Sequence, residues 1–337
     1  MIIPQTCIFM AVYMKNRLIP SALSLPMAFT IVFLASVSLT AQSADSLKAF
    51  PHEISLISDN DILFATDQYY TAGEDLIYRY QPRSSQSFFH NNDSSKMIIS
   101  FQYGFKAFNP KNLDTEAPQN MDRPYCGWHY IGASILNFRK KNSGNFFQMQ
   151  VGLVGPMSGI GQLQEWWHKV LNQYPVQGWD TQISNEVVVN LNYNHTHEFS
   201  LAKKIAIVSS TGAWIGTGSN RITQEITLRL FSFNPLAQSA FMNANVSRVK
   251  RTKPECFVFA SLEGDYVLSN IFIEGSLFRS NPSSYETTIN PWLFSRKIGI
   301  QYSKNRSTLA LSFVHLGKET DFVSTHDYTT LVISRRF

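Results

Sequence analysis

One histidine stands where its ring could do chemistry. His168 lies in the segment 162–173, which reads QLQEWWHKVLNQ and contains no Gly or Pro, so it is predicted to form a short helix. Gln164 precedes it by four residues and lies on the same helical face. An imidazole titrates near neutral pH and can act as a general base on water. A lone His on a helix is, however, more often a surface or packing residue.

A second group of polar residues offers oxygen ligands. Asp59, Asn60 and Asp61 are consecutive, and their side-chain oxygens suit a hard cation such as calcium. The spacing is not that of an EF-hand loop, which needs Gly at position six and Glu at position twelve. Thr71 lies across the first predicted hairpin loop, so it can converge with Asn60 and Asp61. An Asp-Asn-Asp run at a strand end is also typical of a simple turn.

Other catalytic signatures are absent from the sequence. It contains no G-x-S-x-G nucleophile elbow, no H-E-x-x-H and no Cys/His zinc spacing. The segment 122–128, DRPYCGW, places Arg123 beside Pro124. This segment is either a substrate contact or a rigid loop. The remaining hypothesis is a water-activating histidine near an oxygen-rich cation site.

Composition restricts the class of protein that could carry these groups. Of the 337 residues, 44% are hydrophobic and only 16% are charged, whereas about a quarter are charged in a typical soluble domain. This excludes a disordered chain, and three cysteines exclude a disulfide scaffold. Past about residue 42 there is no run of ~18 uncharged apolar residues, which a membrane-spanning helix needs. Pairing of Cys126 with Cys256 stays open.

The first part of the chain is typical of a secretory signal. Residues 14–17, MKNR, are basic, residues 18–39 are uncharged and mostly apolar, and small residues follow at 40–44. We therefore expect a signal peptide over 1–42, with Met14 as a candidate true start, and an exported domain over 43–337. An N-terminal membrane anchor is the alternative. Removing 1–42 leaves a mildly basic chain without a basic stripe, so we expect no nucleic acid partner.

The exported part alternates between apolar and polar residues. In 222–230, for example, Ile222, Ile226 and Leu228 share one parity while Thr223 and Arg229 share the other. A period of two predicts strands with unlike faces. The predicted strands are 52–58, 73–81, 96–105, 127–138, 145–155, 183–194, 200–211, 221–231, 255–266, 294–303, 306–316 and 327–337.

A soluble β-sandwich would show the same alternation. The export signal, the single long domain and the final alternating strand that ends on Phe337 favour an all-β transmembrane antiparallel barrel of about twelve strands. Residues 270–280 could be another strand, which would make fourteen possible, or a folded loop. If strand one runs outward, the loops with the unusual polar residues and the short helix all emerge on the extracellular rim. The connection 232–254 is then long for a periplasmic turn.

Several spaced motifs resemble those of the outer-membrane lipid A 3′-O-deacylase family, and the likeness covers about residues 52–337. The motifs are N-D at 60–61, T-D-x-Y-Y-T-x-G at 66–73, D-R-P-Y-x-G-W at 122–128, Q-x-x-x-H at 164–168, and G-W-D-x-Q at 178–182 leading to N-E at 185–186. Because they occur in order along the chain, they are more specific than a single pattern.

The resemblance implies a twelve-stranded barrel in the bacterial outer membrane, with an active site between the barrel wall and the short helix. It implies calcium-dependent hydrolysis of the 3′-linked acyloxyacyl ester of lipid A. In this interpretation His168 is the general base and Gln164 orients it. Asn60, Asp61 and Thr71 form the opposite wall, which holds the cation or the substrate, and we expect Asp61 and Asp59 to be the Ca²⁺ ligands. The partners are then lipid A or lipopolysaccharide and outer-membrane lipid.

The sequence departs from the family pattern in three places. The family has a substrate-side lysine after the third strand. Lys106 and Lys111 lie near that place, and we expect Lys111, together with Arg123, to bind substrate. Cys126 replaces a more common Ala. Tyr174 replaces an acidic residue that can follow the helix, which leaves three candidate carboxylate partners for the histidine: Glu165, Asp180 and Glu186.

Two other functions remain open from the sequence. The polar minority faces of the strands also suit a non-catalytic barrel, such as a pore, an adhesin or a structural protein. A third interpretation keeps the hydrolysis and makes an outer-leaflet phospholipid the substrate.

Overall fold

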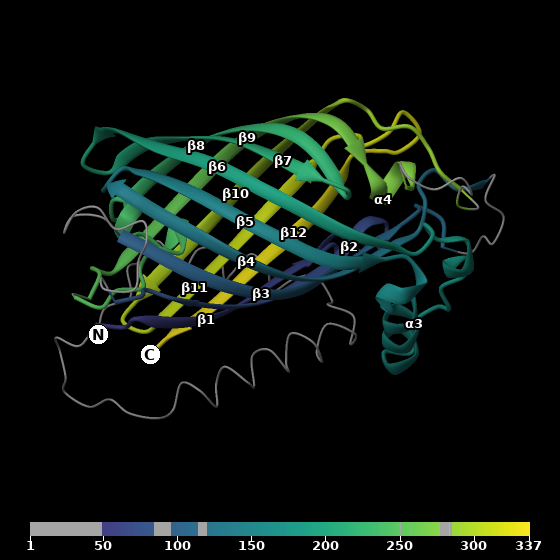
Figure 1. Ribbon diagram of the computed structural model, residues 1–337, viewed down its shortest axis with the longest axis horizontal. Coiled ribbons are helices and arrows are strands. Elements are labelled where there is room, and N and C mark those ends of the chain that lie inside the picture. The colour runs from purple at the N-terminus through teal and green to yellow at the C-terminus, as the bar shows by residue number, and fades with distance from the viewer. Residues whose placement is uncertain (1–48, 84–95, 114–119, 250, 277–282, 284) are drawn as a thin grey trace, which may run out of the picture. The chain divides into compact units, whose positions relative to one another are not determined.

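Twelve antiparallel strands close into a barrel in the computed structural model (Figure 1). The model describes residues 49–83, 96–113, 120–249, 251–276, 283 and 285–337, so the expected signal peptide over 1–42 lies outside the described residues. Each strand pairs with its neighbours in the chain, and the last closes on the first. The strands are β1 (His52–Asn60), β2 (Tyr69–Tyr80), β3 (Lys96–Asn109), β4 (Cys126–Lys140), β5 (Ser143–Val154), β6 (Glu186–Ala202), β7 (Ile205–Gly216), β8 (Ser219–Ser232), β9 (Glu255–Asn270), β10 (Trp292–Lys304), β11 (Ser307–Leu316) and β12 (His326–Arg336).

The predicted fold class is confirmed, and the burial pattern gives the reason. Outward positions carry apolar side chains that stay exposed, for example Leu262 at 68% and Ile131 at 63%. Inward positions carry buried polar side chains such as Asn190 and Thr227. A soluble protein would show the reverse arrangement. An apolar exterior around a polar interior is the pattern of a barrel that spans a membrane.

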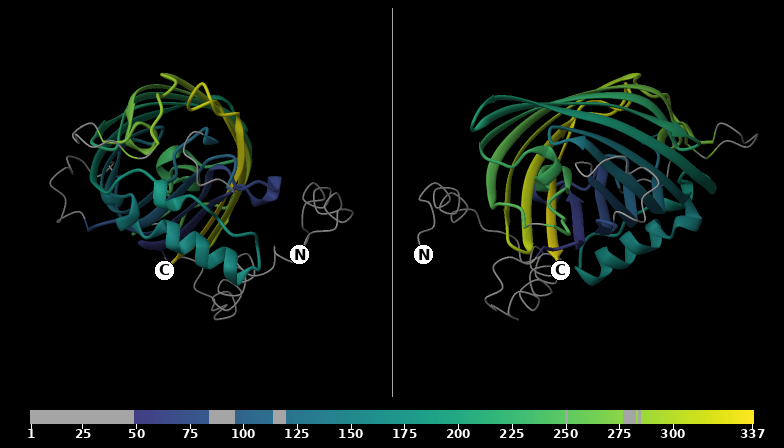
Figure 2. Two further views of the ribbon diagram at one scale, coloured as in Figure 1. Left: turned by 90° about the vertical axis from the view of Figure 1, so that its right-hand side faces the viewer. Right: turned by 60° about the vertical axis from the view of Figure 1, so that its left-hand side comes forward.

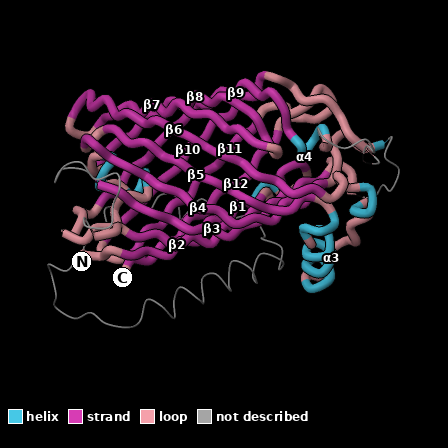
Figure 3. Tube along the Cα trace, viewed as in Figure 1, coloured by secondary structure: helices cyan, strands magenta, loops and turns pink. Residues whose placement is uncertain are grey.

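The helices lie mostly in the connections between strands. The predicted helix is observed as α3 (Ile160–Val170), slightly earlier than expected because Gly159, at φ 72°, begins it. Residues 270–280 add no strand, since the described part forms the single turn α4 (Ile271–Glu274). The prediction of a possible fourteen-stranded barrel was therefore wrong. Both α3 and α4 lie at one end of the barrel, here called the α3 end (Figure 3). Among the described residues, no helix is long and apolar enough to cross a membrane.

The long connection between β8 and β9 folds into the barrel at the end opposite α3 (Figure 2). It contains two 3₁₀ turns, η9 (Leu236–Gln238) and η10 (Ala240–Met242). Leu236 is fully buried and belongs to the same apolar cluster as Ile98 and Phe138 of the barrel wall. The Lys96 ammonium donates to the carbonyls of Ala237, at 2.9 Å, and Ala244. This connection, here called the plug (residues 233–249), explains why the expected periplasmic turn is so long.

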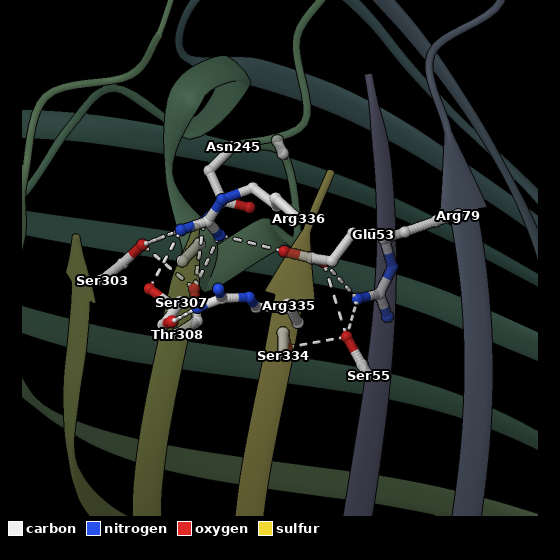
Figure 4. Close-up of polar contacts among 12 residues, drawn as sticks. Glu53, Ser55, Arg79, Asn245, Ser303, Ser307, Thr308, Ser334, Arg335 and Arg336 are labelled. Carbon is white, nitrogen blue, oxygen red and sulfur yellow. Dashed lines mark hydrogen bonds and ion pairs between the residues drawn. The ribbon is translucent and has the colours of Figure 1, made fainter. Parts of the chain in front are cut away.

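A buried ionic network joins the plug to the strands where the barrel closes (Figure 4). Glu53 of β1 pairs with Arg79 of β2 at 2.6 Å and with Arg336 of β12 at 3.0 Å. The Arg336 guanidinium also donates to Thr308 at 2.8 Å, and Asn245 of the plug donates to the same hydroxyl at 3.2 Å. The seam between the first and last strands is thus fixed by side chains as well as by the backbone ladder.

Replacing Arg336 with Ala should therefore destabilise the barrel. The change removes one of two cations from a buried carboxylate, which typically costs about 3 kcal/mol. Urea titration of the refolded protein in lipid vesicles measures this loss. The neighbouring Arg335, which is more exposed and bonds Ser307, is the matched control. Arg335→Ala should stay within about 0.5 kcal/mol of the parent, and equal effects of the two changes would contradict the proposed role of the network.

Candidate active site

Helix α3 is held against the barrel by an apolar cluster at its beginning. Ile160 is buried together with Tyr125, Val176 and Trp179. Gly161 lies directly against Trp179, where an added Cβ would come within 2.9 Å of the indole ring. This close approach fixes the first turn of the helix, so the last turn, which carries His168, has a defined position over the loop between β1 and β2.

Both ring nitrogens of His168 are engaged. Nδ1 donates to the Tyr174 carbonyl at 2.9 Å, and Nε2 lies 2.9 Å from Oδ2 of Asp67. The Tyr174 ring meets the imidazole edge-on, with 5.1 Å between centroids. Only 5% of His168 is exposed. The helix, the loop that follows it and the loop after β1 therefore converge on one imidazole.

Asp67 is the residue that joins these segments. Its Oδ1 accepts from Thr71 Oγ1 at 2.6 Å, Asn109 Nδ2 at 2.9 Å and Gln164 Nε2 at 3.1 Å. Its Oδ2 accepts from the Tyr174 hydroxyl at 3.0 Å as well as from the imidazole. Strands β2 and β3, helix α3 and the loop after it each supply a donor, so this carboxylate fixes their relative positions.

These contacts favour an ion pair between Asp67 and His168. Burial alone raises the pKa of Asp67, but the hydrogen bonds from His168 and Thr71 outweigh it and hold that pKa below its usual value. Burial alone lowers the pKa of His168, yet the Asp67 hydrogen bond and the Tyr174 carbonyl raise it above the usual 6.5. The contacts thus shift both groups toward their charged forms, a carboxylate and an imidazolium.

A second carboxylate lies beside this pair. Asp61 is 2% exposed, and its Oδ1 accepts from the Thr71 hydroxyl at 3.1 Å. Its Oδ2 accepts from Thr66 Oγ1 at 2.8 Å and from the Gln68 amide at 3.1 Å. Burial raises the pKa of Asp61 to about 7. All these donors are neutral, so within the described part of the chain no cation is hydrogen-bonded to this buried carboxylate.

The structure brings some of the predicted site residues into one network. His168, Gln164, Thr71 and Asp61 are linked through Asp67. Gln164 does not contact the imidazole directly. It receives a bond from Trp179 at 2.8 Å and donates to the carboxylate that contacts the imidazole.

Other predicted residues lie outside this network. Asn60 accepts from the Ile62 amide at 2.8 Å and shapes the start of the loop. Asp59 accepts from Tyr70 and Thr330, both at 2.6 Å, and in the described part of the chain it makes no bond to the Asp61 and Asp67 cluster.

The two predicted substrate residues lie in very different surroundings. Arg123 is fully buried, pairs with Glu319 at 3.1 Å and lies 4.4 Å above the Phe108 ring. Lys111 is exposed in the loop after β3, where its amide donates to Asp122 at 3.0 Å. Arg123 therefore stabilises the loop around 122–128, and of the two only Lys111 can reach a ligand at the surface. Cys126 and Cys256 are both present as thiols.

Sequence reasoning missed the carboxylate that contacts His168. The candidates were Glu165, Asp180 and Glu186, all close to the helix in sequence, but the structure gives this place to Asp67. Its signal was present in the T-D-x-Y-Y-T-x-G motif, directly after Thr66. A pairing between residues so far apart in the chain follows from barrel closure and cannot be read from local spacing.

The oxygen atoms around Asp61 fit a hard cation. Among the described residues no three His, Cys, Asp or Glu side chains form one metal-binding group. Calcium, however, also takes hydroxyl, amide and carbonyl oxygens, and Thr71 and Asn60 adjoin Asp61. A buried carboxylate surrounded only by neutral donors is a place where a cation is favourable.

Comparison with known proteins bears on the family and the fold. The family model described as outer membrane protein LpxR matches residues 27–337. The chain belongs to the LpxR family. LpxR from Salmonella typhimurium shares the fold, with a TM-score of 0.66, 16% identity and coverage of 85% of this chain and 100% of that chain.

Another solved barrel shows a weaker likeness. The β domain of the Bordetella autotransporter BrkA has a TM-score of 0.46 at 9% identity, over 86% of this chain and 100% of that chain. No curated protein matches the chain.

Replacing Asp67 with Asn should lower the pKa of His168. The change removes the charged acceptor that raises this pKa, while burial, which lowers it, remains. The imidazole should then lose its proton at a lower pH, as followed by NMR titration of ¹³C-labelled histidine in detergent micelles. Asp180→Asn, at an exposed acid beside Trp179, is the control and should leave the titration unchanged. A pKa that does not move in Asp67→Asn would contradict the ion pair.

Proposed function

We propose that this LpxR-family protein is an outer-membrane esterase that removes the 3′-linked acyloxyacyl chain of lipid A, with its α3 end toward the cell exterior. Family membership supports the substrate class. The observation that carries the proposal is the His168–Asp67 pair next to the buried Asp61, because this arrangement combines a proton acceptor with a cation site. Hydrolysis by activated water needs both groups.

His168 acts as the general base. Its Nδ1–H stays on the Tyr174 carbonyl, which fixes the tautomer and directs Nε2 toward the site. Before the ring can act as a base it must release its Nε2 proton to solvent, and a water molecule must then take the place of the Asp67 oxygen at Nε2 and donate to it. The bonds from Thr71, Asn109 and Gln164 keep Asp67 anchored when that contact opens. The carboxylate then remains close enough to stabilise the imidazolium that forms.

Asp61, with Thr71 and Asn60, would hold the calcium ion. Bound there, the ion supplies positive charge for the oxyanion that forms when water adds to the ester carbonyl. Asp59 is left out of this set, since in the described part of the chain it bonds Tyr70 and Thr330 and makes no bond to the Asp61 and Asp67 cluster. Lys111 is the basic residue we assign to the phosphorylated sugar, because its side chain is exposed at the same end.

The plug argues against an open pore. Residues of the plug such as Leu236, Ala244 and Val246 are fully buried against the wall, and a barrel of this size has little spare interior. A phospholipase remains the nearer alternative, since the same base and cation would cleave a glycerol ester. Incubating the purified protein separately with lipid A and with phospholipid vesicles distinguishes the two, and release of fatty acid from phospholipid alone would overturn the assigned substrate.

Replacing His168 with Ala should abolish most of the activity. Loss of a general base typically lowers the rate by about 10²–10⁴-fold. Mass spectrometry of lipid A from cells that produce the parent or the variant reads the acylation pattern. Trp166→Ala, at an exposed position of the same helix, is the control and should retain activity. If lipid A keeps all its acyl chains in cells that produce well-folded parent protein, the result would count against the whole proposal.

Removal of calcium should also abolish hydrolysis. Excess chelator should stop the release of acyl chains by the purified enzyme, and added calcium should restore it. In Asp61→Asn the calcium concentration that restores hydrolysis should rise at least about tenfold, because the only charged oxygen ligand of the assigned set is lost. Unchanged rates in excess chelator would remove the metal ion from the mechanism.

A further inference from the structure

The outer wall of the barrel carries a groove of about 840 Å³ across β8 to β12. Five outward side chains form one row across these strands, since each is the register partner of the next: Ile226, Leu262, Arg296, His315 and Asp327. The row changes from apolar on β8 and β9 to charged on β10 to β12. The groove is therefore amphipathic along its length.

A second row forms the remainder of the groove. Leu228, Ala260, Ile298 and Phe313 are successive register partners one step further along the strands. Ala260, the small residue in this row, leaves the wall hollow at that position. Phe64 borders the groove from the turn η4 (Ile62–Phe64), and its ring meets Phe313 edge-on at 6.3 Å.

The charged half of the groove contains an arginine side chain, Arg296, that forms no ion pair within the described part of the chain. Arg296 is exposed, and within the described part of the chain it has no hydrogen-bond or ion-pair partner. His315 Nδ1 pairs with Asp327 Oδ1 at 2.7 Å, which holds the imidazole on the strand adjacent to Arg296. Charged side chains on the lipid face of a barrel are unfavourable unless a partner is present. The exposed guanidinium therefore points to an anionic ligand.

The two halves lie at different depths in the barrel wall. His315 and Asp327 adjoin the α3 end of their strands, whereas Leu262 and Ile226 lie near the middle of theirs. At the same end Trp292 and Tyr266 are in contact on the outer wall, with 4.8 Å between ring centroids, as in the aromatic belt of a membrane interface. The charged half is thus close to the headgroup level and the apolar half lies within the hydrocarbon.

We propose that this groove binds lipid A of the outer leaflet, with a phosphate on Arg296 and His315 and an acyl chain along Leu262 and Ile226. The choice of lipid A rests on the proposed function, which places the α3 end in that leaflet. The η4 turn lies between the two sites, since it presents Phe64 to the groove and follows directly on Asp61 of the catalytic cluster. The groove therefore holds a lipid beside the active site without using its residues.

Retention of lipids by the purified protein tests this proposal. All variants carry His168→Ala so that no substrate is consumed, and native mass spectrometry counts the lipid A molecules that remain bound. Arg296→Gln should reduce the affinity for lipid A about tenfold, as expected for loss of one charged hydrogen bond. Arg335→Gln, at an outward arginine near the opposite end, should not reduce it. Lipid A without phosphates should bind the Arg296→Gln variant and its parent equally.

A second variant tests the apolar half independently. Ala260→Trp fills the hollow while keeping every charge, and it should also reduce lipid A retention. Because Ala260 is an exposed outward residue, the barrel should still fold, as shown by its heat-dependent mobility on gels. Unchanged lipid A retention in both Arg296→Gln and Ala260→Trp overturns the proposal that the groove binds lipid A. Equal retention of phosphatidylglycerol and lipid A overturns the assigned occupant.

These results stay separate from the test of the proposed function. Hydrolysis is measured with His168 intact, and binding is measured without it. Hydrolysis that persists while retention is independent of Arg296 overturns only the groove. If retention depends on Arg296 but the protein with His168 intact does not hydrolyse lipid A, only the proposed esterase function is overturned.

Discussion

The outer wall of the barrel faces lipid, and this imposes the constraint on which the rest of the structure depends. Hydrocarbon offers no hydrogen bonds, so each strand must find backbone partners on both sides and the sheet must close. Closure of β12 on β1 leaves no free edge. Because the wall is occupied by this ladder, unusual backbone and unusual chemistry are confined to the two ends. The cluster of His168, Asp67 and Asp61 lies at one end and the plug at the other.

Closure also brings charges together inside the barrel. Arg229 of β8 pairs with Glu198 of β6, and one of its amino groups donates to Ser239 of the plug at 3.0 Å. Glu255 accepts from the same serine hydroxyl, also at 3.0 Å. Such buried pairs contribute little net stability, but removing one partner is costly. Their effect here is to fix where the plug attaches, which makes the end opposite α3 rigid and closed.

Asp67 plays the corresponding role at the α3 end. Its two oxygens accept five hydrogen bonds, four of them from residues that are distant in the chain. A single carboxylate thereby sets the distance between His168 and Thr71, and Thr71 in turn bonds Asp61. The proposed base and the proposed cation site are held in register by this shared acceptor. The loop that carries Asp61 and Asp67 also separates this cluster from the groove on the outer wall.

The sequence alone determined the twelve strands, the short helix and the exported β-barrel class, because alternation with a period of two is a local property that each strand carries by itself. It also singled out His168, Gln164, Asp61 and Thr71 as candidates, whose motifs are local too, and the structure links them through Asp67. Only the tertiary structure decided that Asp67 pairs with His168, that Arg123 is buried and that the 233–249 connection turns inward as a plug. Those outcomes depend on which distant segments meet when the barrel closes, and no short stretch of sequence contains that information.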